Sequence, residues 1–202
     1  MKVLIVGLIY GARPLDIITH NIEVSGYSST YTYVRTEGIS NALNDGLDRM
    51  KDHNFDAVAF LANDILESDN WLLKKVDSIK NYPEAGVVAS SLDVARTSVN
   101  SELIISNWLI PLSTFEKVGY FNESMFPYGP IDLDYCERCT AAGLKTYYVM
   151  NCLAIHQGDH ASGNEYGWDK GELVQKHYQQ LGKYNENNYY LHRLLKKTEI
   201  NK

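Results

Sequence analysis

The sequence has few cysteines and no surplus of positive charge, and each shortage excludes a class of protein. Three cysteines in 202 residues do not form a disulfide framework. Nineteen basic against 25 acidic residues give a net charge of −6, which disfavours a protein that grips nucleic acid through its phosphates. The apolar run KVLIVGLI near the start is too short to cross a bilayer and lacks a signal-peptide cleavage pattern. We therefore expect a cytoplasmic protein without a transmembrane segment.

The aromatic residues are mostly tyrosine, with 15 Tyr against 5 Phe and 3 Trp. A tyrosine combines an apolar ring with a hydroxyl group, which suits a surface that binds polar ligands such as sugars. A tyrosine-rich surface without a ligand explains the same count equally well. The chain is long enough for one domain with a well-buried core.

Strand and helix patterns alternate along the chain. We expect strands at residues 2–9, 30–36, 55–64, 85–91, 101–112 and 145–156, and helices at residues 13–26, 38–53, 67–82, 113–121 and 132–143. Ser113 or Thr114 is the expected cap of the fourth helix, and Gly143 the expected end of the fifth. The tail from about Lys170 also has a helical pattern. This alternation predicts a single α/β domain with a mostly parallel sheet flanked by helices.

Polar residues follow two of the predicted core strands. Asn63 and Asp64 end one strand, and His156 ends another. Ligands of such sheets bind at the carboxyl ends of the strands, and carboxylate and imidazole groups are common ligands of divalent metals. An Asx turn at Asn63–Asp64 and a structural role for the histidine are the competing explanations.

Two carboxylates, Asp132 and Asp134, begin the helix predicted at residues 132–143. The helix dipole alone favours acidic residues there. The preceding FPYGP loop would also place a carboxylate in an aromatic setting suited to a general base. Cys136 and Cys139 form a C-x-x-C within the same helix, but no second such pair exists, which disfavours metal or redox use.

Four segments, in their order, resemble glycosyltransferases of the GT-A fold, most closely those of family 2. They are EGISNALNDGL with Gly38, Asn44 and Gly46, then AFLANDILESDNWL, the block NWLIPLSTFEKVGYFNESMFPYGPIDLDYCERCTAAGLKTYYV, and IHQGDHASG. Together they cover roughly residues 38–163. The resemblance implies one GT-A-like domain over residues 1–202. Its donor half would be about residues 1–90, its acceptor half about 91–165, and its helical tail about 166–202.

The resemblance also implies a role for particular residues. Asp132 would be the catalytic base, and Asp64 and His156 would bind Mn²⁺ or Mg²⁺. The remaining implied contacts are Gly38, Asn44, Asn63 and Asp64 with the donor, and Trp108, Tyr128 and Asp134 with the acceptor. The implied reaction moves a sugar, with inversion, from a nucleotide-sugar, a UDP-sugar being favoured, to a hydroxyl of a glycan or other acceptor. Nucleic acid is not a favoured partner, and a homo-oligomer stays open.

The sequence departs from the family pattern at three places. Ile131 stands where relatives carry an acid before the catalytic one, and Leu43 stands where some carry an arginine. The interval NIEVSGYSSTYTYVRT lacks the Asp-Asn-x-Ser motif that contacts the nucleobase. Two other classes stay open. One is a non-catalytic GT-A-like domain that binds a nucleotide, glycan or partner. The other is a nucleotidyltransferase, whose Gly-rich basic N-terminal signature is missing here.

Overall fold

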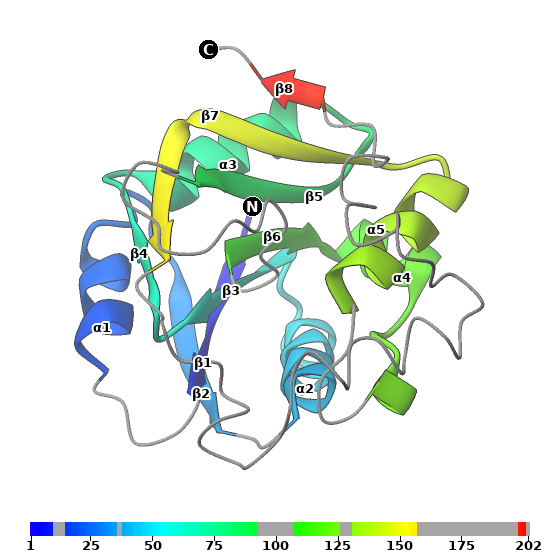
Figure 1. Cartoon of the computed structure of the whole chain (residues 1–202), viewed down its shortest axis with the longest axis horizontal. Helices are drawn as coiled ribbons and strands as arrows, with labels where there is room; N and C mark the ends of the chain where they lie inside the picture. Colours follow the sequence, from blue (N-terminus) through cyan, green and yellow to red (C-terminus); the bar gives the residue numbers. More distant parts are fainter. Residues whose placement is uncertain (10–14, 36–37, 93–106, 126–130, 157–197, 201–202) are drawn as a thin grey trace, which may run out of the picture.

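The computed structural model describes residues 1–9, 15–35, 38–92, 107–125, 131–156 and 198–200 (Figure 1). The strands are β1 (Val3–Ile9), β2 (Thr30–Arg35), β3 (Ala57–Ala62), β4 (Ile65–Glu67), β5 (Ala85–Leu92), β6 (Trp108–Pro111), β7 (Lys145–His156) and β8 (Thr198–Ile200). The helices are α1 (Asp16–Glu23), α2 (Ile39–Asp52), α3 (Trp71–Asn81), α4 (Leu112–Val118) and α5 (Ile131–Ala141), with a 3-10 turn η2 (Glu123–Met125).

The strands form one sheet in the order β2-β1-β3-β6-β5-β7-β4, and β8 pairs with β7. β1 is parallel to β2 and β3, and β7 is parallel to β5 and β8. β6 runs antiparallel to both of its neighbours, and β4 runs antiparallel to β7. The predicted single α/β domain is confirmed, with a sheet that is mixed because of β4 and β6.

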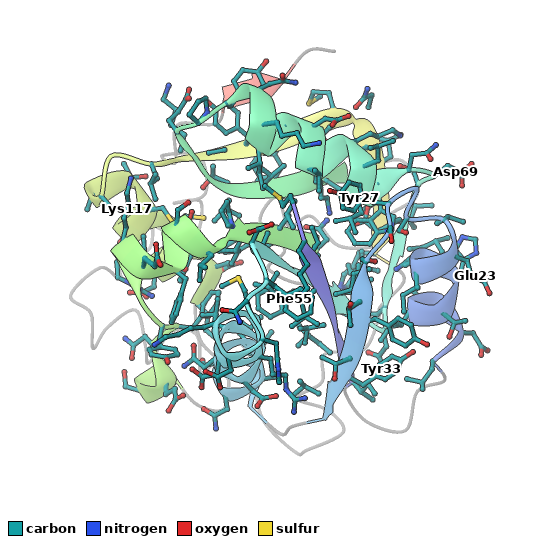
Figure 2. The ribbon with its side chains drawn as sticks, turned by 180° about the vertical axis from the view of Figure 1, so that it is seen from behind. Glu23, Tyr27, Tyr33, Phe55, Asp69 and Lys117 are labelled. Carbon is teal, nitrogen blue, oxygen red and sulfur yellow. The ribbon has the colours of Figure 1, made fainter. Side chains whose placement is uncertain are left out.

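Helices cover both faces of the sheet (Figures 1 and 2). Side chains alternate between the faces along each strand, so Leu4 and Val6 pack in the core with α2 and α5, whereas Val3 and Ile5 pack with α3. Figure 2 shows Tyr27 close to α3, where it adds to the second core. Because both faces are covered, every residue of β1 and β3 is buried, which explains their continuous apolar runs.

α2 approaches the sheet closely because it carries a glycine at the contact. A Cβ at Gly46 would lie 2.6 Å from the Cε1 of Phe60, a distance at which atoms overlap. The same helix contributes a stripe of buried apolar residues at helical spacing: Ile39, Leu43, Leu47 and Met50.

β7 bends in its middle and pairs with β5 and β8 before the bend and with β4 after it. Ser90 of β5 pairs with Val149, but the next residue, Ser91, pairs with Leu153, so residues 150–152 form a bulge. After the bulge, β7 pairs with β4, and His156 lies opposite Ile65. The change of direction is plain in Figure 1, where β7 bends toward β4, and residues 153–154 stay paired with the end of β5. The bulge therefore delivers the end of β7 to the turn that follows β3.

Two expectations about helix starts were wrong. The helix predicted at residues 67–82 begins at Trp71, because Glu67 belongs to β4. Neither Ser113 nor Thr114 caps α4, since that helix begins at Leu112, directly after β6, without a side-chain cap.

The ends of the last two predicted elements have different outcomes. Gly143, with φ of +76°, follows α5 in the left-handed conformation expected after a helix end. The helical tail predicted from Lys170 lies mostly outside the described residues, and Thr198–Ile200 form a strand instead. None of the helices in the described ranges has the length and apolar content needed to cross a bilayer.

Candidate functional site

Asp64 and His156 meet at the carboxyl edge of the sheet, although 91 residues of sequence lie between them. Asp64 is in the two-residue turn between β3 and β4, and His156 ends β7. The Oδ2 of Asp64 lies 3.7 Å from the Nε2 of His156, and the two side chains are 20% and 19% exposed. Asn63, the other residue of the turn, is buried. Asn63 and Asp64 form the turn between the two strands, and the Asp64 carboxylate faces the imidazole of His156.

This pair fits a divalent cation. A cation binds carboxylate oxygen and imidazole nitrogen at about 2.1 Å, so both atoms can contact one ion when they are less than about 4.2 Å apart. The observed 3.7 Å satisfies that condition, and the partial exposure leaves access for a ligand. Among the described residues, no cluster of three or more His, Cys, Asp or Glu side chains forms. Such a two-ligand set resembles Mg²⁺ sites that are completed by substrate phosphates and water.

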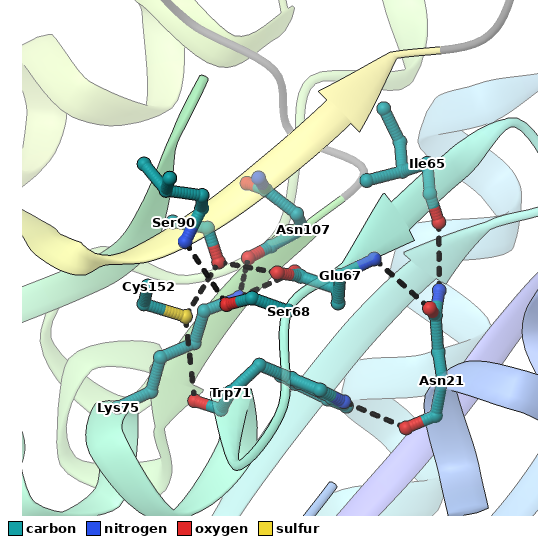
Figure 3. A network of polar contacts seen from close by, with 10 residues as sticks. Asn21, Ile65, Glu67, Ser68, Trp71, Lys75, Ser90, Asn107 and Cys152 are labelled. Atoms are coloured by element: carbon teal, nitrogen blue, oxygen red, sulfur yellow. Dashed lines mark hydrogen bonds and ion pairs between the residues drawn. The ribbon is translucent and has the colours of Figure 1, made fainter. Parts of the chain in front are cut away.

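A buried polar network surrounds Glu67 and holds β4 in place (Figure 3). The Lys75 ammonium donates to the Glu67 carboxylate at 2.9 Å and to the Asn107 carbonyl at 2.6 Å. The Ser90 hydroxyl donates to the other carboxylate oxygen of Glu67 at 2.6 Å. Both members of the ion pair are 0% exposed, so each charge depends on these partners for stabilisation.

Asp132 lies in the first turn of α5, at the same edge of the sheet. Its Oδ1 accepts the backbone N–H of Leu133 at 2.9 Å, and the side chain is partly exposed. The contacts of α5 show that its start, with Asp132, lies toward the carboxyl end of β5. Tyr135, near the start, packs on Trp108, which pairs with the later part of β5, whereas Cys139, near the end, lies beside Gly86 at the start of β5.

Asp134 has a partner within the helix. Arg138 pairs with it at 2.9 Å and also donates to the Val118 carbonyl at 2.9 Å. The Asp134 side chain is only 12% exposed. The pair therefore braces α5 against the end of α4, which is a sufficient structural role for this carboxylate.

Asn44 is engaged inside the protein. Its amide accepts the Phe121 N–H at 2.8 Å and donates to the Phe121 carbonyl at 3.1 Å and to the Glu123 carboxylate at 2.8 Å. These bonds fasten α2 to the turn before α5. Gly38 is buried and is the N-cap of α2. A direct donor contact by either residue stays a prediction.

Two more residues, Trp108 and Tyr128, were expected to contact the acceptor. Trp108 is 0% exposed and packs against Tyr135 with ring centroids 6.3 Å apart. It therefore supports α5, and a contact of Trp108 with an acceptor stays a prediction. Tyr128 lies outside the described residues. Ile131 is 2% exposed and belongs to the core, so the position where relatives carry an acid is a packing position here.

The two thiols of the C-x-x-C pair are not joined by a disulfide. Cys136 and Cys139 are both free and buried in the core between α5 and the sheet. Burial raises the pKa of the Cys139 thiol to about 12 and raises the pKa of the Cys136 thiol further. Both groups stay protonated at neutral pH, which is unsuited to metal binding or thiol exchange.

Three residues that support the site were not predicted from the sequence. Lys75 stands within the apolar stripe of α3, between Leu72 and Ile79, and a charge in such a stripe was the available signal. Asn21 is likewise a buried polar residue on a helix whose other buried residue is Ile18. Glu67 gave no signal, because its strand has only three residues.

No protein-family model and no curated protein matches the chain. Solved structures do. The mannosyltransferase PcManGT from Pyrobaculum calidifontis, in complex with GDP-Man and Mn²⁺, aligns over 81% of this chain with a TM-score of 0.60 and 15% identity. GalNAc-T7 with UDP, GalNAc and Mn²⁺ aligns over 88% with a TM-score of 0.61 and 11% identity. A protein from STIV aligns over 79% of this chain and 87% of its own length, with a TM-score of 0.54 and 17% identity.

These similarities show a GT-A-like fold. The chain spans 59% of the mannosyltransferase and 46% of GalNAc-T7. The identities are too low for the fold match to transfer an activity, because one fold hosts many functions. The chemistry must therefore be argued from the site.

Proposed function

We propose that this protein is a metal-assisted glycosyltransferase that moves a sugar from a nucleoside diphosphate to an acceptor hydroxyl. The observation that carries the proposal is the approach of Asp64 and His156 to 3.7 Å at the carboxyl edge of the sheet. The GT-A-like fold and the bound nucleotides and Mn²⁺ named for two of its structural neighbours support it.

On the donor side, Asp64 and His156 would hold Mn²⁺ or Mg²⁺ against the diphosphate. When bound, the cation offsets the negative charge that develops on the diphosphate oxygens as they leave. The chain's own contribution is to keep a carboxylate and an imidazole at a fixed separation with partial access from outside. A UDP-sugar is the favoured donor.

On the acceptor side, Asp132 would act as the general base. The acceptor oxygen forms a bond to the anomeric carbon while the bond from that carbon to the diphosphate oxygen breaks, and the electron pair leaves with the diphosphate. The acceptor's proton passes to the Asp132 carboxylate. Attack opposite the leaving group inverts the anomeric configuration. General-base assistance of this kind is worth roughly 10²–10⁴-fold in rate.

The test is turnover of a panel of UDP-, GDP- and TDP-sugars, with and without Mn²⁺. We expect metal-dependent release of the nucleoside diphosphate, slowed roughly 10²-fold or more in Asp132→Asn with donor binding retained. Asp64→Asn should instead lose the response to Mn²⁺. The matched control is Asp69→Asn, the same substitution at an exposed position (Figure 2), which should turn over like the unmodified protein.

Full turnover by Asp132→Asn would remove the base from the mechanism. If no nucleotide-sugar of the panel is turned over but one binds, the non-catalytic GT-A-like alternative holds. The buried, apolar Ile131 next to the proposed base is the observation that keeps this alternative in view.

A further inference from the structure

The outer edge of β4 is completed by a side chain. β4 pairs with β7 on one side only. On the other side, the amide of Asn21 in α1 donates to the Ile65 carbonyl at 2.7 Å and accepts the Glu67 N–H at 2.9 Å (Figure 3). One carboxamide thus satisfies the two backbone groups that a neighbouring strand would otherwise bind.

Asn21 is well suited to hold this strand rigidly. Its side chain is 0% exposed. Its backbone carbonyl accepts the indole N–H of Trp71 at 2.7 Å, which ties the same residue to α3. Without the carboxamide, the Ile65 carbonyl and the Glu67 N–H would lose their partners in a water-poor setting, which favours movement of the strand.

The contact between Asn21 and β4 lies next to Asp64 and His156. Ile65 directly follows Asp64, and its partner across β4 and β7 is His156. The Glu67 end of β4 is also anchored through its carboxylate by Lys75. Loss of the carboxamide therefore acts mainly on the Ile65 end, where the two proposed metal ligands lie.

We propose that Asn21 is a positioning residue that fixes the separation of Asp64 and His156 and thereby sets the affinity for a divalent cation. The inference rests on the proposed function, because it takes these two residues as the metal ligands. A site with two protein ligands binds well only when both are held at a compatible distance. Supporting residues of this kind typically change metal affinity 10–100-fold.

The chain offers a matched control in Asn44. It is also a buried asparagine on a helix, and its amide also holds a backbone carbonyl and a backbone N–H, both of Phe121. Its contacts are with the turn before α5, away from β4. Asn44→Ala therefore removes the same kind of bonds while leaving the Asp64 turn untouched.

The experiment measures the binding of Mn²⁺ alone to the whole chain by electron paramagnetic resonance. We expect Asn21→Ala to weaken Mn²⁺ binding about tenfold, while Asn44→Ala stays within about twofold of the unmodified protein. Asn21→Ser, which leaves a smaller gap, should give an intermediate loss. Equal affinity in Asn21→Ala and the unmodified protein, or an equal loss in both alanine variants, would overturn the inference.

Asp64→Asn separates this failure from failure of the proposed function. If Asp64→Asn binds Mn²⁺ as the unmodified protein does, the metal site itself is wrong and the inference ends with it. If Asp64→Asn loses binding but Asn21→Ala does not, only the positioning role is wrong.

A further measurement needs neither metal nor variant. Hydrogen exchange of the unmodified protein should show strong protection of the Glu67 amide, and rapid exchange there would contradict the clamp.

Discussion

Replacing Lys75 with methionine should destabilise the protein strongly. The ammonium is 0% exposed and donates to the Glu67 carboxylate and to the Asn107 carbonyl. Methionine fills much of the same volume, but it leaves the Glu67 carboxylate as a buried charge that still accepts the hydrogen bond of the Ser90 hydroxyl. Breaking a buried pair from one side costs about 3–5 kcal/mol. With a urea m value of about 2 kcal/mol/M, the midpoint falls by about 2 M.

The measurement is urea unfolding followed by circular dichroism, with two companions to Lys75→Met. The double variant Glu67→Gln with Lys75→Met removes both charges and should recover most of the lost free energy of unfolding, since uncharged replacements of buried pairs are often neutral. Lys80→Met is the matched control on the same helix. Its ion pair with Asp77 is about half exposed, so its effect should stay below about 1 kcal/mol. A midpoint in Lys75→Met equal to that of Lys80→Met would refute the reasoning.

Three further predictions concern the core around α2 and α5. Gly46→Ala should lower the free energy of unfolding by about 1–3 kcal/mol, measured in urea, because the added Cβ overlaps the buried Phe60 ring; a gain in stability would show that the ring moves aside. Ile131→Glu, which introduces the acid found at this position in the glycosyltransferases that the sequence resembles, should cost about 3 kcal/mol or more at pH 7. Burial raises the pKa of the introduced carboxyl, so the cost should shrink as the pH falls toward 4, and a pH-independent cost would contradict this. Cys136 and Cys139 should resist a thiol reagent at pH 8 until the protein unfolds, because burial raises the pKa of both thiols; fast labelling of the folded protein would count against their burial.

The periodicity of the chain was enough to predict the main elements of the sheet and its helices. β1 and β3 are continuous apolar runs because both of their faces are covered, and such a run can be recognised without knowing the neighbouring strands. The rule that ligands bind at the carboxyl ends of strands also brought Asp64 and His156 into one prediction before any distance was known.

What the sequence could not predict depends on contacts between distant segments. β4 has three residues, too few for a hydrophobic period, and it exists because β7 and Asn21 bind its two edges. Asn44 shows the limit of a motif. Its residue type matches the pattern of the glycosyltransferases that the sequence resembles, but its amide forms hydrogen bonds with Phe121 and Glu123 inside the protein. Spacing identifies a residue type at a position, whereas its partners decide its role.

The geometry of the site depends on the number of residues in the β7 bulge. Because side chains alternate between the faces of a strand, removing one residue from 150–152 while β7 keeps its pairing with β5 would shift the whole segment after the bulge by one position. His156 would then point to the opposite face from Asp64 and would no longer lie opposite Ile65. Homologous chains that keep this chemistry are therefore expected to conserve the length of the bulge even where its side chains vary.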